Sequence, residues 1–440
     1  MVPSHVLDRL LALPKFGTGL GMRRTTALLD KVAPFPPPSI GITGSNGKGS
    51  VTVMTDSLLR SQGFTTVRHV SPHFLDPNER ISLNGKILPP TRFNDLIDRV
   101  LDSASAISLR DREQFCRFEI LFAAALALAS EERVDCAVLE AGIGGRFDPT
   151  GLANPDPVAI TAVELEHTEV LGPTKELIAL DKMDLAAPGG TVILGPLEDD
   201  LFGRMEAYAK RRDVRLIRVS TVFAPIDYRE DHNGPVAIIG GSNDHQYLLK
   251  LPLAGEFQTS NATISLALAQ IFVKRISPNA EIDWIKVANT AWRDLSWPGR
   301  LQSVSQDPEV VVDAGHTPEA LNMVVRSILN WRPSPRILLL GASKSKDWQA
   351  IAQVLVKLDA VAVVSRSPHD GVPPDQMAMA FIAAGGRVLA IKEELSQAVD
   401  LARTEAKRIG GTVYALGGLF FSADVVRVIS GLNPYDAVYL

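Results

Sequence analysis

Cysteine and basic clusters are scarce in this sequence, and their scarcity excludes several classes of protein. Two cysteines, Cys116 and Cys136, among 440 residues provide neither a disulfide framework nor a zinc site. The formal net charge is −5, and the densest basic run, residues 210–212, is typical of a solvated helix end. We therefore expect a reducing, cytoplasmic setting and no nucleic-acid partner.

Long apolar runs and export signals are also absent. No run reaches the roughly 18 residues that a membrane span needs, and the apolar stretch Ile120 to Ala129 is short and Ala-rich, as expected for a buried helix. Residues 1–20 lack the charged-then-apolar layout that marks secretion. We expect no membrane partner. The length indicates two domains, which we place at residues 1–297 and 298–440.

Short β-branched runs alternate with segments of helical spacing through most of the chain. Strands are predicted at 39–43, 135–139 and 158–163, and polar residues gather just after them. This pattern is typical of an open, mostly parallel sheet with its ligand crevice at the carboxyl edge. The strand-like pattern with turns at residues 214–251 indicates a small antiparallel sheet. From residue 310 the alternation of strands and helices starts again. The predicted fold class is α/β: a P-loop-type N-terminal domain and a smaller Rossmann-like C-terminal domain.

The run Gly44-Ser45-Asn46-Gly47-Lys48-Gly49-Ser50 follows the first of these strands and precedes a helix. Glycines allow backbone N–H groups to close around phosphate oxygens, a lysine reaches the outer phosphates, and a hydroxyl serves a magnesium ion. The spelling departs from the common P-loop because Gly49 separates Lys48 from Ser50. The alternative is an ordinary strand-to-helix turn, and residues further along the chain decide between the two.

Three residues follow predicted strands on the same side of the sheet as this run: Ser71, Glu140 and His167. Taken singly, a Ser-Pro is usually a turn, and a lone histidine is more often hydrogen-bonded than bound to a metal. Their common placement at one carboxyl edge favours a magnesium and nucleotide site, because magnesium prefers hard oxygen ligands beside phosphates.

The order of these motifs resembles folylpolyglutamate synthase and dihydrofolate synthase, members of the Mur ligase superfamily, over nearly the whole chain. The matching stretches are residues 44–50, 71–73, 79–81, 118–119, 139–140, 144–146, His167, 171–172, 181–182, 251–253, Gln258, 261–262, 299–301, Asp313, His316 and Pro318. Individually, only the glycine-rich run and Gly144-Gly145-Arg146 are conspicuous. Together they are highly specific.

The resemblance implies an ATP-dependent amide ligase that phosphorylates a carboxylic acid and then joins it to an amino acid, with L-glutamate and a folate or dihydropteroate acid as the expected pair. It implies two magnesium ions, one held by Ser71 and Glu140 and the second by His167. Lys182 corresponds to a lysine that is carbamylated and so becomes a magnesium ligand. The alternative for Lys182 is a surface lysine beside Asp181. The resemblance also implies a monomer.

The remaining implied roles concern the nucleotide and the acid. Asn261 would face the nucleotide base and Arg300 the phosphates, while Asp313 and His316 would close over the site from the second domain. With Lys48, His167 and Lys182, His316 completes the implied catalytic set. The implied acid-substrate contacts are Arg80, Phe118, Arg146 and Asp148.

Several positions on the substrate side depart from the family pattern, and two of them lose a hydroxyl. These positions are Phe122, Pro149, Phe257, Thr317 and Gly418. Losing a hydrogen-bonding partner changes selectivity far more than an apolar exchange does. A second hypothesis is therefore the same ligase chemistry on a non-folate acid or another amino acid. A third is a non-catalytic ATP-binding scaffold, which the retained lysines and histidines argue against.

Overall fold

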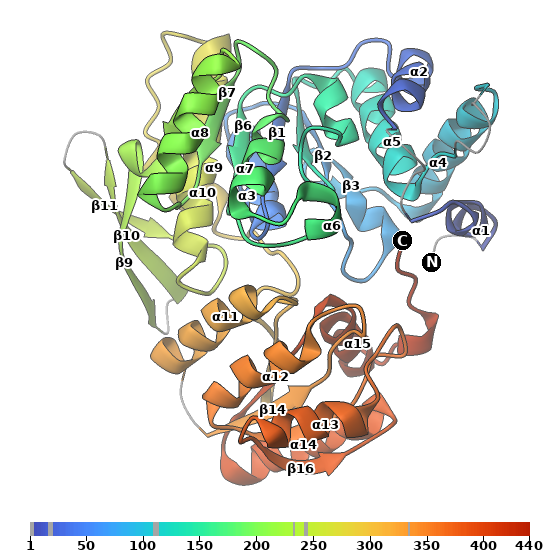
Figure 1. Ribbon diagram of the computed structural model, residues 1–440, viewed down its shortest axis with the longest axis vertical. Helices are drawn as coiled ribbons and strands as arrows, with labels where there is room; N and C mark the ends of the chain where they lie inside the picture. The colour runs from blue at the N-terminus through green and yellow to red at the C-terminus, as the bar shows by residue number, and fades with distance from the viewer. Residues whose placement is uncertain (1–3, 16–20, 109–113, 232–233, 242–244, 333–334) are drawn as a thin grey trace.

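The computed structural model describes residues 4–15, 21–108, 114–231, 234–241, 245–332 and 335–440. These residues form two lobes, of which the upper carries an eight-stranded and a three-stranded sheet and the lower a six-stranded sheet (Figure 1). The predicted fold class, a mostly parallel α/β sheet followed by a smaller α/β unit, is confirmed.

The eight-stranded sheet has the order β4-β3-β2-β5-β1-β6-β7-β8, and only the pairs made by β3 are antiparallel. The strands are β1 (Ser39–Thr43), β2 (Thr66–His69), β3 (Ile81–Leu83), β4 (Lys86–Ile87), β5 (Cys136–Glu140), β6 (Val158–Ile160), β7 (Thr191–Leu194) and β8 (Arg215–Arg218). Because β1 pairs with both β5 and β6, the segments that follow these three strands meet at the centre of the carboxyl edge.

Helices cover both faces of this sheet. They are α1 (Ser4–Ala12), α2 (Met22–Val32), α3 (Lys48–Ser61), α4 (Pro90–Ser105), α5 (Arg117–Glu131), α6 (Thr168–Leu171), α7 (Lys175–Met183), α8 (Asp199–Arg211), α9 (Gln258–Ile276) and α10 (Trp284–Ala291). Side chains alternate across β5, so that Val138 packs with α3 and α9 while Leu139 packs with α4 and α5. Both faces are buried, which explains why β5 is apolar throughout before Glu140.

Residues 214–251 contain the predicted antiparallel sheet, formed by β9 (Phe223–Asp231), β10 (Gly234–Gly241) and β11 (Gln246–Lys250). The prediction was wrong at its start, because β8 runs parallel to β7 and belongs to the large sheet. Helix α8 between β7 and β8 supplies the crossover that a parallel pair requires.

The lower lobe has the strand order β12-β13-β17-β14-β15-β16, with β12 antiparallel to β13. Its strands are β12 (Gln302–Gln306), β13 (Glu309–Val312), β14 (Arg336–Leu340), β15 (Val361–Val364), β16 (Arg387–Ile391) and β17 (Thr412–Leu416). Its helices are α11 (Pro318–Trp331), α12 (Trp348–Leu355), α13 (Pro374–Ala383), α14 (Leu395–Ile409) and α15 (Leu419–Ile429). Of the helices, α2, α6, α10, α13 and α15 were not predicted.

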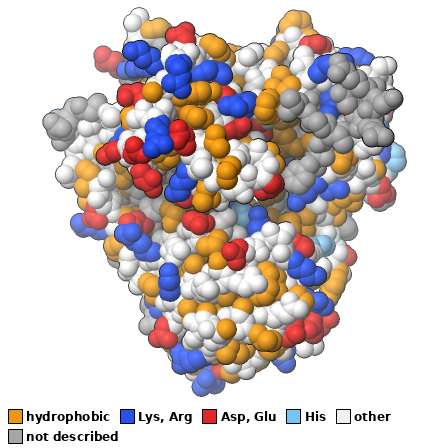
Figure 2. All heavy atoms as spheres, viewed as in Figure 1, with side chains coloured by type: hydrophobic (Ala, Val, Ile, Leu, Met, Phe, Trp, Pro, Cys, Tyr) orange, Lys and Arg blue, Asp and Glu red, His pale blue; other side chains and the backbone are white. Residues whose placement is uncertain are grey.

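On the face shown in Figure 2 the surface is broadest across the upper lobe and tapers towards the lower lobe, and acidic and basic side chains are interspersed over it. Within the described ranges, no helix has both the length and the apolar character required to cross a bilayer.

Candidate functional site

The glycine-rich run forms a tight turn between β1 and α3, and two of its glycines are required by their surroundings. Gly44 and Gly47 have φ values of +141° and +86°. A Cβ at Gly44 would lie 2.0 Å from the Thr161 hydroxyl, and one at Gly47 would lie 2.4 Å from Oδ1 of Asn261. Glycine is therefore required at both positions, by the positive φ and by the close approach of Thr161 and Asn261. The turn leaves the first N–H groups of α3 available for an anion.

The side chains of Lys48 and Ser50 in this turn are positioned to bind phosphate and a metal ion. Nζ of Lys48 donates to the carbonyl oxygen of Gly44 over 2.7 Å, which holds the ammonium group over the turn. The hydroxyl of Ser50 is buried and has no hydrogen-bond partner among the described residues. A buried polar group without a partner costs free energy, so the Ser50 hydroxyl fits a ligand atom or a hydrated cation.

Glu140 ends β5 beside this turn. Its Oε2 accepts the backbone N–H of Ser71 over 3.2 Å, and its side chain is almost fully buried. Burial raises the pKa of Glu140 to about 7, although the positive charges of Lys48, Arg300 and Arg80 act in the opposite direction. A buried carboxyl group with one backbone donor and nearby cations is a suitable ligand for a metal ion.

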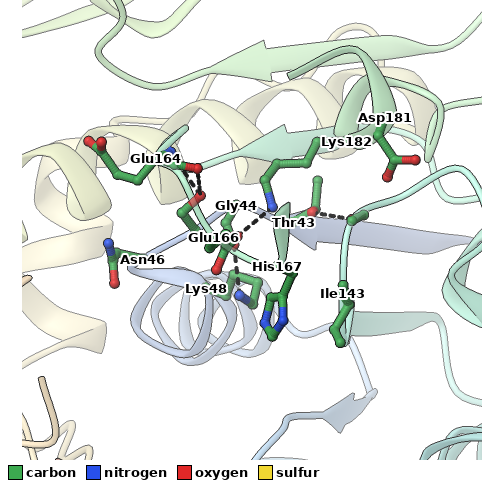
Figure 3. Close-up of polar contacts among 12 residues, drawn as sticks. Thr43, Gly44, Asn46, Lys48, Ile143, Glu164, Glu166, His167, Asp181 and Lys182 are labelled. Atoms are coloured by element: carbon green, nitrogen blue, oxygen red, sulfur yellow. Dashed lines mark hydrogen bonds and ion pairs between the residues drawn. The ribbon is translucent and has the colours of Figure 1, made fainter. Parts of the chain in front are cut away.

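Lys182 and Glu166 form a buried ion pair on the other side of the turn, with 2.8 Å between Nζ and Oε1. Figure 3 shows this pair together with Lys48 and His167 beside Gly44. His167 has a left-handed backbone at φ 45° and begins α6. Burial lowers the pKa of His167, opposed by Glu166, and therefore favours the neutral imidazole that a metal ion binds.

The Gly144-Gly145-Arg146 motif positions Lys182. The N–H of Gly145 donates to Oδ1 of Asp181 over 2.8 Å, and a Cβ at Gly145 would lie 2.7 Å from the carbonyl oxygen of Lys182. Only glycine permits this approach to α7. The motif is thus explained by the close packing of one loop against the helix that carries the buried lysine.

The lower lobe contributes three of the predicted site residues, Arg300, Asp313 and His316. Arg300 donates to the carbonyl oxygen of Gly299, and its charge acts on Glu140. The buried Asp313 accepts the N–H groups of Leu301 and Gly315 over 2.9 and 2.8 Å, so it holds the start of this lobe in place. Burial followed by the charge of Lys346 lowers the pKa of His316 to about 4.

The four residues predicted to contact the acid substrate already have partners within the protein. Both oxygens of Asp148 accept backbone N–H groups, those of Gly142 and Ile143 on Oδ2 and that of Thr150 on Oδ1. These three bonds make Asp148 a loop cap in this structure.

Arg146 pairs with Asp184, the residue that follows α7, and Asp184 also pairs with Arg212. Arg80 is buried and bound to His73 and Leu440. Phe118 packs against Gly142 and the ring of His69.

No group of three or more His, Cys, Asp or Glu side chains that would hold a metal is present in the described part of the chain. The predicted ligands nevertheless fit magnesium, because this ion usually takes one or two carboxylates and completes its shell with phosphate oxygens and water. The orphaned Ser50 hydroxyl and the buried Glu140 carboxyl are the observations that support this fit.

Sequence reasoning missed three contributors to the site. Glu166 partners Lys182, and its place after β6 was a usable signal. Lys346 is half-buried and acts electrostatically on both His167 and His316. His73 binds Arg80. Lys346 was not predictable as a neighbour of His167, because it lies in the lower lobe and His167 in the upper lobe. His73 lies only seven residues before Arg80, so their contact is local in the sequence.

Two domain models match this chain: the Mur ligase middle domain over residues 42–269 and the Mur ligase glutamate ligase domain over residues 299–418. The chain belongs to the Mur ligase family.

Its relatives include folylpolyglutamate synthases, which confirms the resemblance stated from the sequence. A probable bifunctional folylpolyglutamate synthase/dihydropteroate synthase of Halobacterium salinarum is 32% identical over 94% of this chain, which spans 50% of that relative. The chain thus has about half the length of the relative. A dihydrofolate synthase/folylpolyglutamate synthase of Mycobacterium tuberculosis is 27% identical over 98% of this chain and 94% of that protein. The structure of Mycobacterium tuberculosis folylpolyglutamate synthase complexed with ADP superposes with a TM-score of 0.86 at 26% identity, covering 97% of each chain.

Proposed function

We propose that this protein is an ATP-dependent ligase that joins L-glutamate to the carboxylate of a folate or dihydropteroate acid through an acyl phosphate. The observation that carries the proposal is the meeting of Lys48, Glu140 and the Glu166–Lys182 pair around one glycine-rich turn. The names of the relatives supply the acid and the amino acid.

The chain's own residues would divide the work as follows. The turn at residues 44–50 binds the triphosphate of ATP, and Lys48 leaves the Gly44 carbonyl to neutralise charge on the transferring phosphoryl group. The substrate carboxylate attacks this group, ADP leaves, and the amine of the amino acid then displaces phosphate from the acyl carbon. Asn261, lying against Gly47, contacts the nucleotide, and Arg300 contacts its phosphates.

Magnesium, when bound, supplies positive charge that neutralises the phosphate oxygens. Ser71 and Glu140 would hold one ion and His167 a second. Closure of the lower lobe brings Asp313 and His316 towards the phosphates and excludes water from the acyl phosphate.

Lys182 would be carbamylated. An amine reacts with carbon dioxide only in its neutral form, and burial, opposed by Glu166, lowers the pKa of Lys182. The carbamate would give this buried position oxygen atoms in place of a cation, and so a fourth protein ligand for magnesium beside Ser71, Glu140 and His167.

The same chemistry on a non-folate acid is the second candidate, and one observation favours it. Both ring nitrogens of the buried His69 lack a hydrogen-bond partner within the described ranges, and the His69 ring contacts Phe118 and Phe122. Phe122 stands where the family has a threonine. Beside Phe118, which the family resemblance makes a contact of the acid, this chain therefore presents a different set of polar groups from the family pattern.

The deciding experiment measures ADP formation and product mass with ATP, magnesium, glutamate and either dihydropteroate or tetrahydrofolate. We expect addition of one glutamyl group, loss of turnover in Lys48→Ala, and normal turnover in Lys357→Ala, which changes an exposed lysine of the lower lobe. ADP formation with other acids only would favour the second candidate. No ADP formation with any acid would leave the scaffold hypothesis.

A further inference from the structure

A short segment beyond α15, Ala437–Leu440, connects the two lobes beside the candidate site. It follows the 3-10 helix Pro434–Asp436 of the lower lobe and reaches the loop after β2 in the upper lobe. In Figure 1 the red end of the chain crosses from the lower lobe towards β3. None of these four residues belongs to a motif of the family pattern quoted above.

Tyr439 anchors this segment to the lower lobe. Its hydroxyl donates to Oδ1 of the fully buried Asp424 over 2.9 Å, while the Ser367 hydroxyl donates to Oδ2. The Tyr439 ring lies 4.3 Å from Phe420 and 4.9 Å from His369, measured between ring centroids. On its other side the ring stacks on His73 of the upper lobe at 6.0 Å and 3°.

The backbone on either side of Tyr439 binds the upper lobe. Nε of Arg80 donates to Nδ1 of His73 over 3.0 Å, and since an arginine only donates, the His73 proton must lie on Nε2. That Nε2–H donates to the carbonyl oxygen of Val438 over 2.7 Å. Arg80 also donates to the carbonyl oxygen of Leu440 over 2.8 Å. The segment therefore fixes both the tautomer of His73 and the direction of Arg80.

His73 and Arg80 flank a loop that is itself tied to the candidate metal site. The carboxylate of Glu79 accepts the N–H groups of Phe74, Leu75 and Asp76, which holds residues 74–76 in one conformation. The same loop begins at Ser71, whose N–H binds Glu140.

The Phe74 side chain enters the core of the lower lobe, where it packs with Val312 and Ala314. The loop at residues 71–76 is thus joined to the lower lobe through Phe74 and through the contact of His73 with Tyr439.

We propose that Tyr439 is a positioning residue of the ligase site: it anchors Val438 and Leu440, which hold His73 and Arg80 and thereby the loop that carries Ser71. The proposal rests on the proposed function for the role of Ser71 and Arg80. It assigns to Ala437–Leu440 the task of keeping that loop in place when the lobes are docked.

The test compares three full-length variants by hydrogen exchange of peptides covering residues 71–80. Tyr439→Ala should speed exchange of the Phe74, Leu75 and Asp76 amides about tenfold, because it removes the anchor from a locally opening unit. Tyr439→Phe keeps the ring contacts and should give a smaller increase. Tyr435→Phe is the matched control: Tyr435 lies four residues before Tyr439, and its hydroxyl donates to the exposed Glu394. Removing that hydroxyl should leave the exchange of residues 71–80 unchanged.

Two binding measurements separate positioning from general destabilisation. In Tyr439→Phe and Tyr439→Ala, the magnesium concentration giving half-maximal ADP binding should rise, whereas the Kd for ADP in EDTA should stay within twofold of wild type. If the amides of residues 74–76 exchange at the wild-type rate in Tyr439→Ala, the proposal is overturned. If exchange in Tyr439→Ala is faster over the whole protein, Tyr439→Phe decides instead, and unchanged exchange of these amides in that variant overturns the proposal. An unchanged magnesium requirement also overturns it.

The activity assay separates this proposal from the proposed function. If the wild-type chain forms no glutamyl product with any folate acid, the proposed function fails, while exchange and ADP binding still decide the role of Tyr439. If the wild type is active, kcat/KM for the acid should fall about tenfold in Tyr439→Ala and remain unchanged in Tyr435→Phe.

Discussion

Nζ of Lys182 donates to Oε1 of Glu166 over 2.8 Å, and the Lys182 side chain is 1% exposed. A lysine so deeply buried beside one carboxylate is uncommon, because burial penalises its charge. The same burial keeps a larger share of the amine neutral, as carbamylation requires. The backbone of Lys182 is packed against Gly145, where a Cβ would lie 2.7 Å from the Lys182 carbonyl oxygen.

The first prediction concerns this lysine. Lys182→Ala should lower turnover at least about 100-fold, because it removes the proposed carbamate ligand of magnesium. Millimolar short carboxylates such as acetate should restore part of the turnover by occupying the vacated space. Lys182→Met fills that space with an apolar chain and should lose turnover without rescue. Equal behaviour of the two variants would refute a carbamate at this position, and intact-mass analysis of the wild type checks for the added carbon dioxide.

The second prediction uses two glycines with nearly the same backbone. Gly47 and Gly63 have φ values of +86° and +87°, but a Cβ at Gly63 meets nothing within 4 Å. Alanine at either position should cost about 1 kcal/mol of unfolding free energy, from the left-handed backbone alone. Only Gly47→Ala should also weaken ADP binding, by more than about tenfold, because its methyl group displaces Asn261. Calorimetric ADP binding and urea unfolding measure the two effects, and equal ADP affinities would contradict the role given to the turn.

The third prediction is a pH dependence set by Glu140. Its pKa is raised by burial from 4.5 to about 7, so its contribution to stability is complete below about pH 4.5 and is lost as pH rises through about 7. Without magnesium and nucleotide, wild-type stability should therefore fall relative to Glu140→Gln between about pH 5 and 8. Urea unfolding at several pH values checks this. Parallel curves for the two proteins would show that Glu140 does not titrate in this range.

The same carboxyl group should release a proton when metal binds. At pH 7, addition of magnesium and ADP should release protons from the wild type, measured by calorimetry in buffers of different ionisation enthalpy. Glu140→Gln should release fewer.

The fourth prediction treats Asp148 as a structural cap. Because its two oxygens accept three backbone N–H groups, Asp148→Ala should lower the unfolding free energy by about 2 kcal/mol. Asp148→Asn keeps one accepting oxygen and should lose less. If the alanine variant keeps its stability and instead loses affinity for the acid, Asp148 is a substrate ligand, as the family resemblance implies.

Local patterns were sufficient for most of the fold. The strand at 39–43, the buried helix within 118–129 and the restart of βα alternation after residue 310 all follow from short apolar runs and helical spacing. The missed helix α13 lies between β15 and β16, where the parallel alternation already implied a crossover, whereas α15 follows the last strand, β17, and no crossover implied it. The strand β8 was assigned to the wrong sheet because pairing partners are not encoded in the strand itself.

The sequence by itself determined the glycine-rich turn, Glu140 at the end of β5, His167 after β6, and the class of protein, because these depend on residue type and spacing along one chain. The tertiary structure alone decided which charges meet. It paired Lys182 with Glu166, directed Arg146 to Asp184, filled both oxygens of Asp148, and placed Tyr439 against His73. Such contacts join residues that are far apart in the chain, and their electrostatic strength depends on burial, which only the packed lobes create.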